Sequence, residues 1–169
     1  MSVSRIFVLD TNTLIEAKNR YYGFDICPGF WFTLLEQHNS GRLHSIDRVK
    51  TELLRQEDDL TVWVRDHAPA TFFHPTATPE TVEKYSRLMT WAYAHSAFFP
   101  GAKNEFATNA DAWLIAHAAV NGLVVVTQEQ YSATAKRRIL IPNVCLEFNV
   151  ECVDTYSMLR DLGVSFSRI

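Results

Sequence analysis

The chain has 169 residues, of which 47% are hydrophobic and 21% are charged, as in an average globular protein. This length can bury a core without disulfides or a structural metal, so we expect a single domain that spans residues 1–169. The formal net charge of −3 excludes a general electrostatic attraction for nucleic acid. A nucleic-acid partner would therefore need a local basic patch.

The cysteines and the apolar segments indicate the compartment. Cys27, Cys145 and Cys152 are an odd number without a C-x-x-C pair, which is typical of reduced thiols that pack in a core. The N-terminal apolar run reaches Asp10 too soon for a signal peptide, and no segment approaches the roughly 18 apolar residues of a membrane span. We expect a soluble, cytoplasmic protein without membrane association.

The first half of the chain predicts strands that alternate with helices. Residues 5–9 (RIFVL) are a nearly continuous apolar run, which is typical of a parallel strand covered on both faces. The elements expected after it are a helix at 12–18, a loop at 19–27, a helix at 28–39, a strand at 43–46, a helix with Asp47 as its N-cap and a helix at 58–67.

The second half continues the alternation. A helix from Ala110, capped by Thr108 or Asn109, should end at Asn121-Gly122, and residues 123–126 (LVVV) predict a second fully apolar strand. The other expected elements are an edge strand at 71–74, a helix at 79–91, a loop at 96–104, a strand region within 144–153 and a helix at 154–162.

Strands that alternate with helices predict an α/β fold, in which a mostly parallel central sheet has helices on both faces. Such sheets bind their ligands at the carboxyl ends of the strands. Asp10 follows the strand at 5–9, and Glu129 follows the strand at 123–126. Both acids are therefore expected at one edge of the sheet.

Four acids stand out by position, and each also has an ordinary structural interpretation. Asp10 can cap the helix behind it. Glu52 can be a solvated helix acid paired with a neighbouring arginine, and Asp111 can interact favourably with a helix N-terminus. Glu129 can be a plain turn residue. If the four meet, however, repulsion between carboxylates about 4 Å apart, roughly 4 kcal/mol, must be relieved by protonation, by spreading or by a bound cation.

As a set, the four acids resemble the motifs of PIN-domain nucleases. The matching segments are VLDTN at 8–12, Glu52 in VKTELL, DAWLIAHA at 111–118 and VVVTQE at 124–129. The stretches EAKNRYYGFDICPGFW and AKRRILIPNVC also resemble a VapC-like branch that is often the toxin of a toxin–antitoxin pair. One departure is Glu129, where many PIN domains have Asp.

The resemblance implies a three-layer α/β/α fold and a metal-dependent endoribonuclease. Hard oxygen ligands select Mg²⁺ or Mn²⁺, and one or two such ions would assist hydrolysis of RNA phosphodiester bonds. The expected partners are RNA, a cognate antitoxin protein and, in a homodimer, a second copy of the chain. The implied catalytic residues are Asp10, Glu52, Asp111, Glu129 and Asn12, of which the four acids would be the metal ligands.

Two segments combine cations with positions near the predicted edge. Lys18, Arg20, Tyr21 and Tyr22 can hold phosphate and stack an unpaired base, or they can be loop packing with solvated cations. The run Lys136, Arg137 and Arg138 can bind RNA or a partner, or it can be an ordinary wet surface. The six histidines show no metal-ligand spacing, and His95 and His117 are interpreted as helix-face residues.

Two other functions are compatible with the sequence. A phosphatase that uses Asp10 as nucleophile would resemble haloacid-dehalogenase-like enzymes, but those carry a second Asp where this chain has Asn12. A PIN-like module without metal could instead bind RNA or protein without cleaving it. The presence of all four acids argues against that second alternative.

Overall fold

The structure, a computed structural model, describes residues 3–168 of the chain. At its centre is a five-stranded sheet in the order β3-β2-β1-β4-β5, in which each neighbouring pair is parallel. The strands are β1 (Phe7–Leu9), β2 (Leu43–Ile46), β3 (Phe73–His74), β4 (Val124–Val126) and β5 (Cys152–Val153). The predicted α/β class with a parallel central sheet is confirmed.

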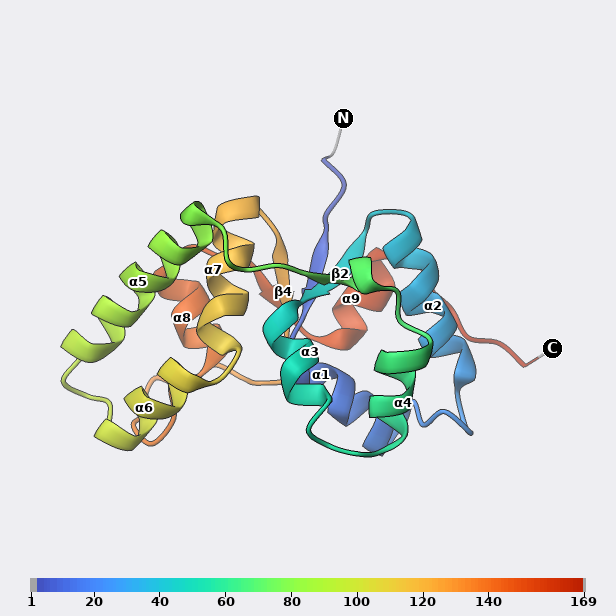
Figure 1. Ribbon diagram of the computed structural model, residues 1–169, viewed down its shortest axis with the longest axis horizontal. Coiled ribbons are helices and arrows are strands. Elements are labelled where there is room, and N and C mark those ends of the chain that lie inside the picture. Colours follow the sequence, from blue (N-terminus) through green and yellow to red (C-terminus); the bar gives the residue numbers. More distant parts are fainter. Residues whose placement is uncertain (1–2, 169) are drawn as a thin grey trace.

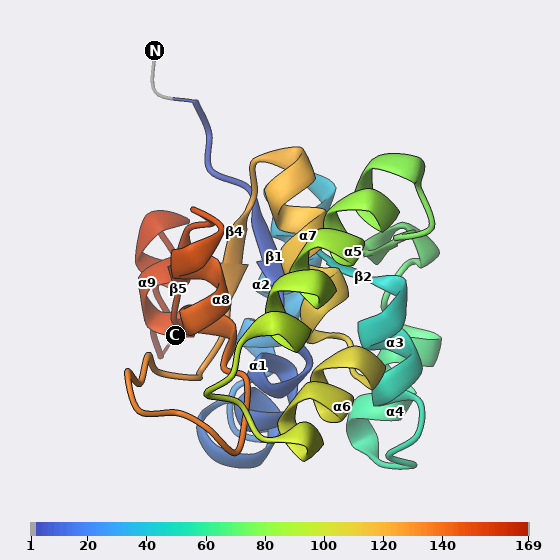
Figure 2. The same ribbon diagram turned by 90° about the vertical axis from the view of Figure 1, so that its left-hand side faces the viewer.

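Helices cover both faces of this sheet. They are α1 (Thr11–Glu16), the π-helix η1 (Ala17–Tyr21), α2 (Pro28–Asn39), α3 (Asp47–Leu53), α4 (Asp59–Asp66), the 3₁₀-helix η2 (Ala70–Phe72), α5 (Pro79–Ala94), α6 (Pro100–Thr108), α7 (Asp111–Asn121), α8 (Ile141–Glu147) and α9 (Thr155–Asp161). In Figure 1, α5, α6, α7 and α8 lie to the left of the strands, and α2, α4 and α9 lie to the right. Figure 2 turns the first group toward the viewer. No helix within residues 3–168 combines the length and the apolar composition of a membrane span.

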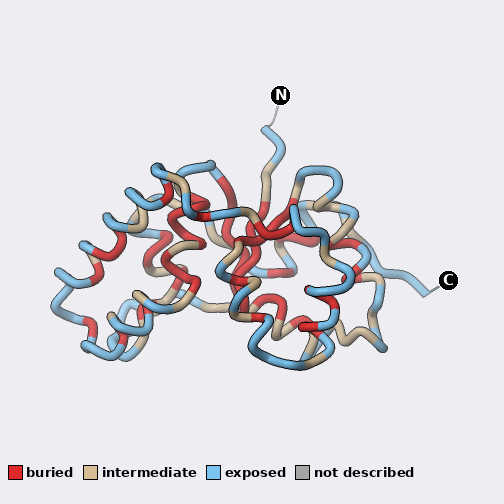
Figure 3. Tube along the Cα trace, viewed as in Figure 1, coloured by how far each residue is buried: buried red, intermediate tan, exposed pale blue. Residues whose placement is uncertain are grey.

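The core of the sheet is apolar because helices cover it on both sides. All residues of β1 and of β4 are buried, and Figure 3 shows this burial as red trace at the centre of the molecule. Full burial of a side chain such as Phe7 or Leu9 contributes about 1.5–3 kcal/mol. Each of these two strands has only three residues, and the burial of their side chains is what stabilises them.

The register between β1 and β4 determines which polar residues leave the sheet together. Phe7 pairs with Val124, and Leu9 pairs with Val126. The backbone N–H of Asp10 donates to the carbonyl of Val126 over 3.1 Å. Asp10 and Thr127 therefore emerge next to each other at the carboxyl edge of the sheet.

Three segments differ from the sequence prediction. The edge strand expected at 71–74 forms only at Phe73–His74, because residues 70–72 form η2. Residues 96–104 were expected to be a loop, but α6 begins at Pro100, because Pro suits a first helical turn and the helix buries Ala102 and Phe106. A strand region was expected within 144–153, but α8 fills its first part and β5 has only two residues. Pro142 lies in the first turn of α8, and Ile141, Val144 and Cys145 face the core at helical spacing.

Helix beginnings and ends were predicted with mixed success. Ile46, and not Asp47, is the N-cap of α3, and the Asp47 carboxylate accepts hydrogen bonds from Thr76 and from the backbone N–H of Arg48. Gly122 ends α7 in the left-handed conformation, with φ of 65°, as the Asn-Gly pair predicted. The helix expected at 12–18 continues to Tyr21 through η1, into residues that were expected to be a loop.

Candidate active site

The topology carries the four predicted acids to one region at the carboxyl edge of the sheet. Asp10 directly follows β1, and Glu129 follows β4. Glu52 lies on α3, which continues from β2, and Asp111 is the first residue of α7, the helix that leads into β4. The charges of Asp10, Glu129 and Glu52 all raise the pKa of Asp111, so the four acids form one electrostatic unit.

Asp10 is buried, with 1% of its surface exposed. Its side chain makes no capping hydrogen bond to α1, and its Oδ2 instead accepts a 3.0 Å hydrogen bond from the Thr127 hydroxyl. Burial, reinforced by the charge of Glu129, raises the pKa of Asp10 from 3.8 to about 7. Asp10 thus occupies the N-cap position of α1, but its buried carboxylate is held mainly by Thr127 across the sheet edge.

Asp111 is 5% exposed and is held by Asn109. The Asn109 amide donates to Asp111 Oδ2 over 3.2 Å, and the Asp111 backbone N–H donates to Asn109 Oδ1 over 3.0 Å. Burial and the charge of Asp10 raise the pKa of Asp111 well above 3.8. Ala110, and not Thr108 or Asn109, is the N-cap of α7, but Asn109 satisfies a free N–H of this helix and orients the Asp111 carboxylate.

Glu52 joins three helices through its two carboxylate oxygens. The hydroxyl of Thr11, on α1, donates to Oε2. The backbone N–H of Ala110, just before α7, donates to Oε1 over 2.8 Å. Glu52 is therefore not the solvated surface acid of the ordinary interpretation, because it fixes α1, α3 and the start of α7 around the other acids.

Glu129 is held between a backbone donor and a cation. Its Oε2 accepts a 2.7 Å hydrogen bond from the backbone N–H of Ile141. The Arg138 guanidinium lies 2.7 Å from Oε1, but the contact lacks hydrogen-bond geometry, so Oε1 is buried without a donor. Arg138 is thus an ion-pair partner of the cluster and not a free phosphate contact.

The donor atoms fit a hard divalent cation that keeps part of its water. Among residues 3–168, no three of the acids offer oxygens that all lie within 4.8 Å of one another. Such spreading is expected of carboxylates that repel each other. Mg²⁺ is usually held by one or two carboxylates and several waters, so this arrangement suits it without a closed cage.

Sequence reasoning missed part of the supporting hydrogen-bond network. Asn12, one of the implied catalytic residues, acts on Asp10 through its backbone N–H, which lowers the pKa of that acid. The side-chain contacts, however, come from Thr127 to Asp10 and from Thr11 to Glu52. A signal for Thr127 was available, because a hydroxyl directly behind a buried strand reaches the same edge as Asp10.

The segment with Lys18, Arg20, Tyr21 and Tyr22 is mostly engaged in packing and ion pairs. Lys18 contacts Asp58 at 2.7 Å, and Arg20 contacts Glu16 at 2.9 Å. Tyr22 stacks on Phe30 with ring centroids 4.4 Å apart. Tyr21 is exposed and meets the edge of Tyr156. The loop-packing interpretation holds for Tyr22, and Tyr21 is the ring that a ligand can reach.

The loop after Glu129 presents free cations beside exposed rings. Lys136 and Arg137 are exposed, and they line a shallow pocket of about 410 Å³ together with Phe99. Phe99, the N-cap of α6, is 48% exposed. Tyr131, on the loop after Glu129, is 56% exposed. Arg138 lines the same pocket and contacts Glu129, so this surface adjoins the acidic cluster at Glu129.

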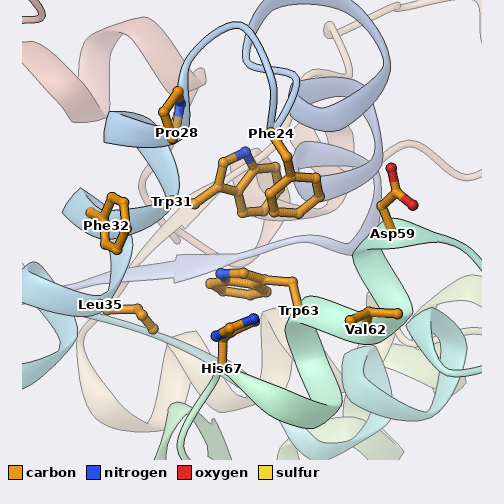
Figure 4. A pocket seen from close by; sticks show the side chains of 9 residues that line it. All are labelled: Phe24, Pro28, Trp31, Phe32, Leu35, Asp59, Val62, Trp63 and His67. Atoms are coloured by element: carbon orange, nitrogen blue, oxygen red, sulfur yellow. The ribbon is translucent and has the colours of Figure 1, made fainter.

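A separate apolar groove lies between α2 and α4. Its volume is about 370 Å³, and Figure 4 shows Phe24, Trp31 and Trp63 at its base with Phe32 and Val62 at its sides. Phe24 stacks on Trp31 at 4.2 Å, and Phe32 is 67% exposed. An exposed aromatic ring beside a preformed apolar groove is typical of a protein-binding surface.

Three solved structures are similar to this chain over most of its length. VapBC2 from Rickettsia felis, bound to a DNA fragment from the promoter, has a TM-score of 0.53 at 16% identity, covering 88% of this chain and 98% of that chain. FitAB bound to the IR36 DNA fragment has a TM-score of 0.53 at 14% identity, and the match covers 96% of this chain and 100% of that chain. FitAcB from Neisseria gonorrhoeae has a TM-score of 0.52 at 15% identity, and the match covers 89% of this chain and 99% of that chain. These matches show the fold, and they confirm the predicted PIN-like architecture.

No curated protein matches the chain. Residues 7–166 match the family described as "Domain of unknown function (DUF4411)". This match includes all four acids and every strand of the sheet. The chain therefore belongs to the DUF4411 family, and its fold is that of the PIN-like proteins.

Proposed function

We propose that this protein is a metal-dependent endoribonuclease that hydrolyses RNA phosphodiester bonds and is the toxin of a type II toxin–antitoxin pair. The observation that carries the proposal is the burial of Asp10 and Asp111 at one sheet edge, where the charge of the first raises the pKa of the second. Buried acids that repel each other cost stability. Their presence together on a PIN-like fold is best explained by catalysis.

Asp10, Glu52, Asp111 and Glu129 would hold one or two Mg²⁺ or Mn²⁺ ions. Such an ion supplies a water of lowered pKa and stabilises negative charge on the phosphate. The chain's own part is to hold the carboxylates in place through Thr127, Asn109 and Thr11. Asn12, in the first turn of α1, would orient the attacking water.

We propose RNA as the substrate because of the cations and exposed rings on and beside the loop that follows Glu129. Lys136 and Arg137 would contact phosphates, and Phe99 or Tyr131 would stack on an unpaired base. Tyr21 offers a further exposed ring. Because these groups can contact only a few phosphates, the favoured substrate is single-stranded or loop RNA, and its binding should weaken with salt.

The structural neighbours VapBC2 and FitAB support a protein partner, since both are two-component assemblies bound to DNA. We place the antitoxin contact in the groove between α2 and α4, where an apolar segment of the partner would cover Phe32. A co-purification assay with the product of a neighbouring small reading frame tests this placement. Phe32→Asp should abolish co-purification and preserve cleavage, whereas Val82→Asp, at an exposed apolar position on α5, should change neither.

The activity itself is tested with labelled single-stranded RNA and purified protein in Mg²⁺ or Mn²⁺. We expect metal-dependent cleavage that falls by roughly two orders of magnitude or more in Asp10→Asn and in Asp111→Asn. Asp25→Asn, in an exposed loop, is the matched control and should cleave normally. Wild-type cleavage by both cluster variants would refute the proposal, and a covalent aspartyl-phosphate on Asp10 would favour a phosphatase.

A further inference from the structure

Three histidines that are far apart in the sequence meet on the side of β2 that faces α7. His44 is on β2, His74 ends β3 and His117 is on α7. Each offers one ring nitrogen, and these three nitrogens all lie within 4.8 Å of one another. None of these residues belongs to the acidic cluster, and no role in the proposed nuclease reaction uses them.

His44 and His117 contact each other through their ring nitrogens. Their Nε2 atoms are 2.9 Å apart, and their ring planes are nearly perpendicular, at 86°. A metal ion lies in the plane of the imidazole that ligates it, so perpendicular rings can point their lone pairs at one common position. With Zn–N distances of about 2.0–2.1 Å, tetrahedral ligation would require these two nitrogens to separate by roughly half an ångström.

The third ring must turn to complete the site. His74 stacks on His44 at 3.7 Å with an interplanar angle of 10°, and parallel rings cannot both direct a lone pair at one ion. His74 has room to turn, because it is only half-buried and lines a pocket of about 320 Å³ together with His117. The same pocket admits solvent, so that a water molecule can supply a fourth ligand.

The protonation states also suit metal binding. Burial lowers the pKa of His44 to about 3 and that of His117 to about 4, and it lowers the pKa of His74. All three imidazoles are therefore neutral at pH 7, which is the form that ligates metal. The Asn121 amide N–H donates to Nδ1 of His117 over 3.3 Å, which fixes the orientation of that ring and places its proton on Nε2, between His117 and His44. A zinc ion would take the place of this proton, so its binding must release one.

We propose that His44, His74 and His117 form a zinc site that joins β2, β3 and α7. Three imidazoles with no carboxylate among them favour Zn²⁺ over Mg²⁺, which prefers oxygen ligands. The role of the site is structural: α7 carries Asp111 at its first residue, and the zinc site would fix this helix to the sheet near its other end.

The test uses the full chain with Asp10→Asn and Asp111→Asn, so that the acidic cluster contributes little metal affinity and the nuclease proposal is not tested at the same time. We expect this protein to bind one equivalent of Zn²⁺ with a raised Tm, and to give with Co²⁺ the intense visible band of a four-coordinate nitrogen site. Adding His74→Gln or His117→Gln should weaken Zn²⁺ binding at least tenfold. His95→Gln, at an exposed position, should leave it unchanged.

Three results would overturn the zinc site. The first is the absence of Zn²⁺ binding at micromolar concentration by the parent protein. The second is the weak spectrum of octahedral, oxygen-ligated Co²⁺. The third is unchanged Zn²⁺ affinity in both histidine variants. If the buried His117 variant fails to fold, the variant of the half-buried His74 and the Co²⁺ spectrum of the parent still decide the question.

Discussion

The hydroxyl of Thr127 donates a 3.0 Å hydrogen bond to the buried carboxylate of Asp10. The two residues meet because β1 and β4 are parallel neighbours in which Leu9 pairs with Val126. The bond lowers the pKa of Asp10, against the larger effect of burial, which raises it. The pairing of β1 with β4 therefore contributes directly to the protonation state of Asp10.

Replacing Thr127 by Val should weaken both the fold and the site. The change removes the donor to Asp10 and the acceptor of the Glu129 backbone N–H, so we expect a loss of about 1–3 kcal/mol in unfolding free energy. It should also raise the pKa of Asp10 and reduce Mn²⁺ affinity and RNA cleavage. Urea denaturation, calorimetry and a cleavage assay measure these effects.

Thr13→Val is the matched control for this change. Thr13 is also buried, and its hydroxyl donates a 3.0 Å hydrogen bond to the carbonyl of Val126, without contact to an acid. It should lose similar stability but keep Mn²⁺ affinity. Equal losses of Mn²⁺ affinity in the two variants would show that the Thr127 hydroxyl has no specific role at the site.

Asp10 should make the metal-free protein less stable as the pH rises. Its folded pKa of about 7 lies above its ordinary value of 3.8, so the folded state binds a proton that the unfolded chain has released. The stabilisation is full below about pH 4 and is lost as the pH rises through 7. Asp10→Asn removes this dependence, and it should be the more stable protein in EDTA at pH 8 by a few kcal/mol.

The measurement is the difference between wild type and Asp10→Asn in urea at several pH values. Two buried histidines act in the opposite direction, because the folded pKa values of His44 and His117 are depressed and their stabilisation is lost as the pH falls below about 6.5. Both proteins share this effect, so it cancels in the difference. A difference that stays constant from pH 5 to 8 would contradict the raised pKa of Asp10.

Charge reversal at Lys136 and Arg137 should weaken RNA binding and leave the chemical step intact. Both side chains are exposed and free of the ion pair that engages Arg138. The double Glu variant should raise KM with little change in kcat, and it should reduce the slope of log K against log salt by about 1.4 if both contact phosphates. Charge reversal of Lys84 and Arg87 on α5 is the control, and it should leave KM unchanged. An unchanged KM in the Lys136 and Arg137 variant would remove this loop from the RNA surface.

The sequence predicted the parts of this molecule that rest on local patterns. The apolar runs at β1 and β4 and the end of α7 at Gly122 follow from burial and from backbone chemistry within a few residues. Asp10 and Glu129 could also be placed at one edge, because parallel strands end together.

The remaining features depend on contacts that no local pattern encodes. Arg138 was grouped with Lys136 and Arg137 as a basic run, and only the folded chain shows its pairing with Glu129. The meeting of His44 with His117 depends on how α7 crosses β2, so no spacing along the sequence could indicate it. The strand expected near Val144 shows the same limit, since β-branched residues also suit a buried helix face.

Arg138→Gln should increase the affinity of the acidic cluster for Mn²⁺. The guanidinium lies 2.7 Å from Glu129 and lowers the pKa of Asp111, so it acts as a built-in cation that competes with a metal ion. Because its side chain is 42% exposed, we expect only about 1 kcal/mol, or about a fivefold lower Kd. The metal-free variant should be less stable than wild type at pH 8, because Glu129 loses its partner. Arg137→Gln, which removes an adjacent exposed charge, should change neither quantity, and equal Mn²⁺ affinities in the two variants would show that Arg138 does not compete with the metal.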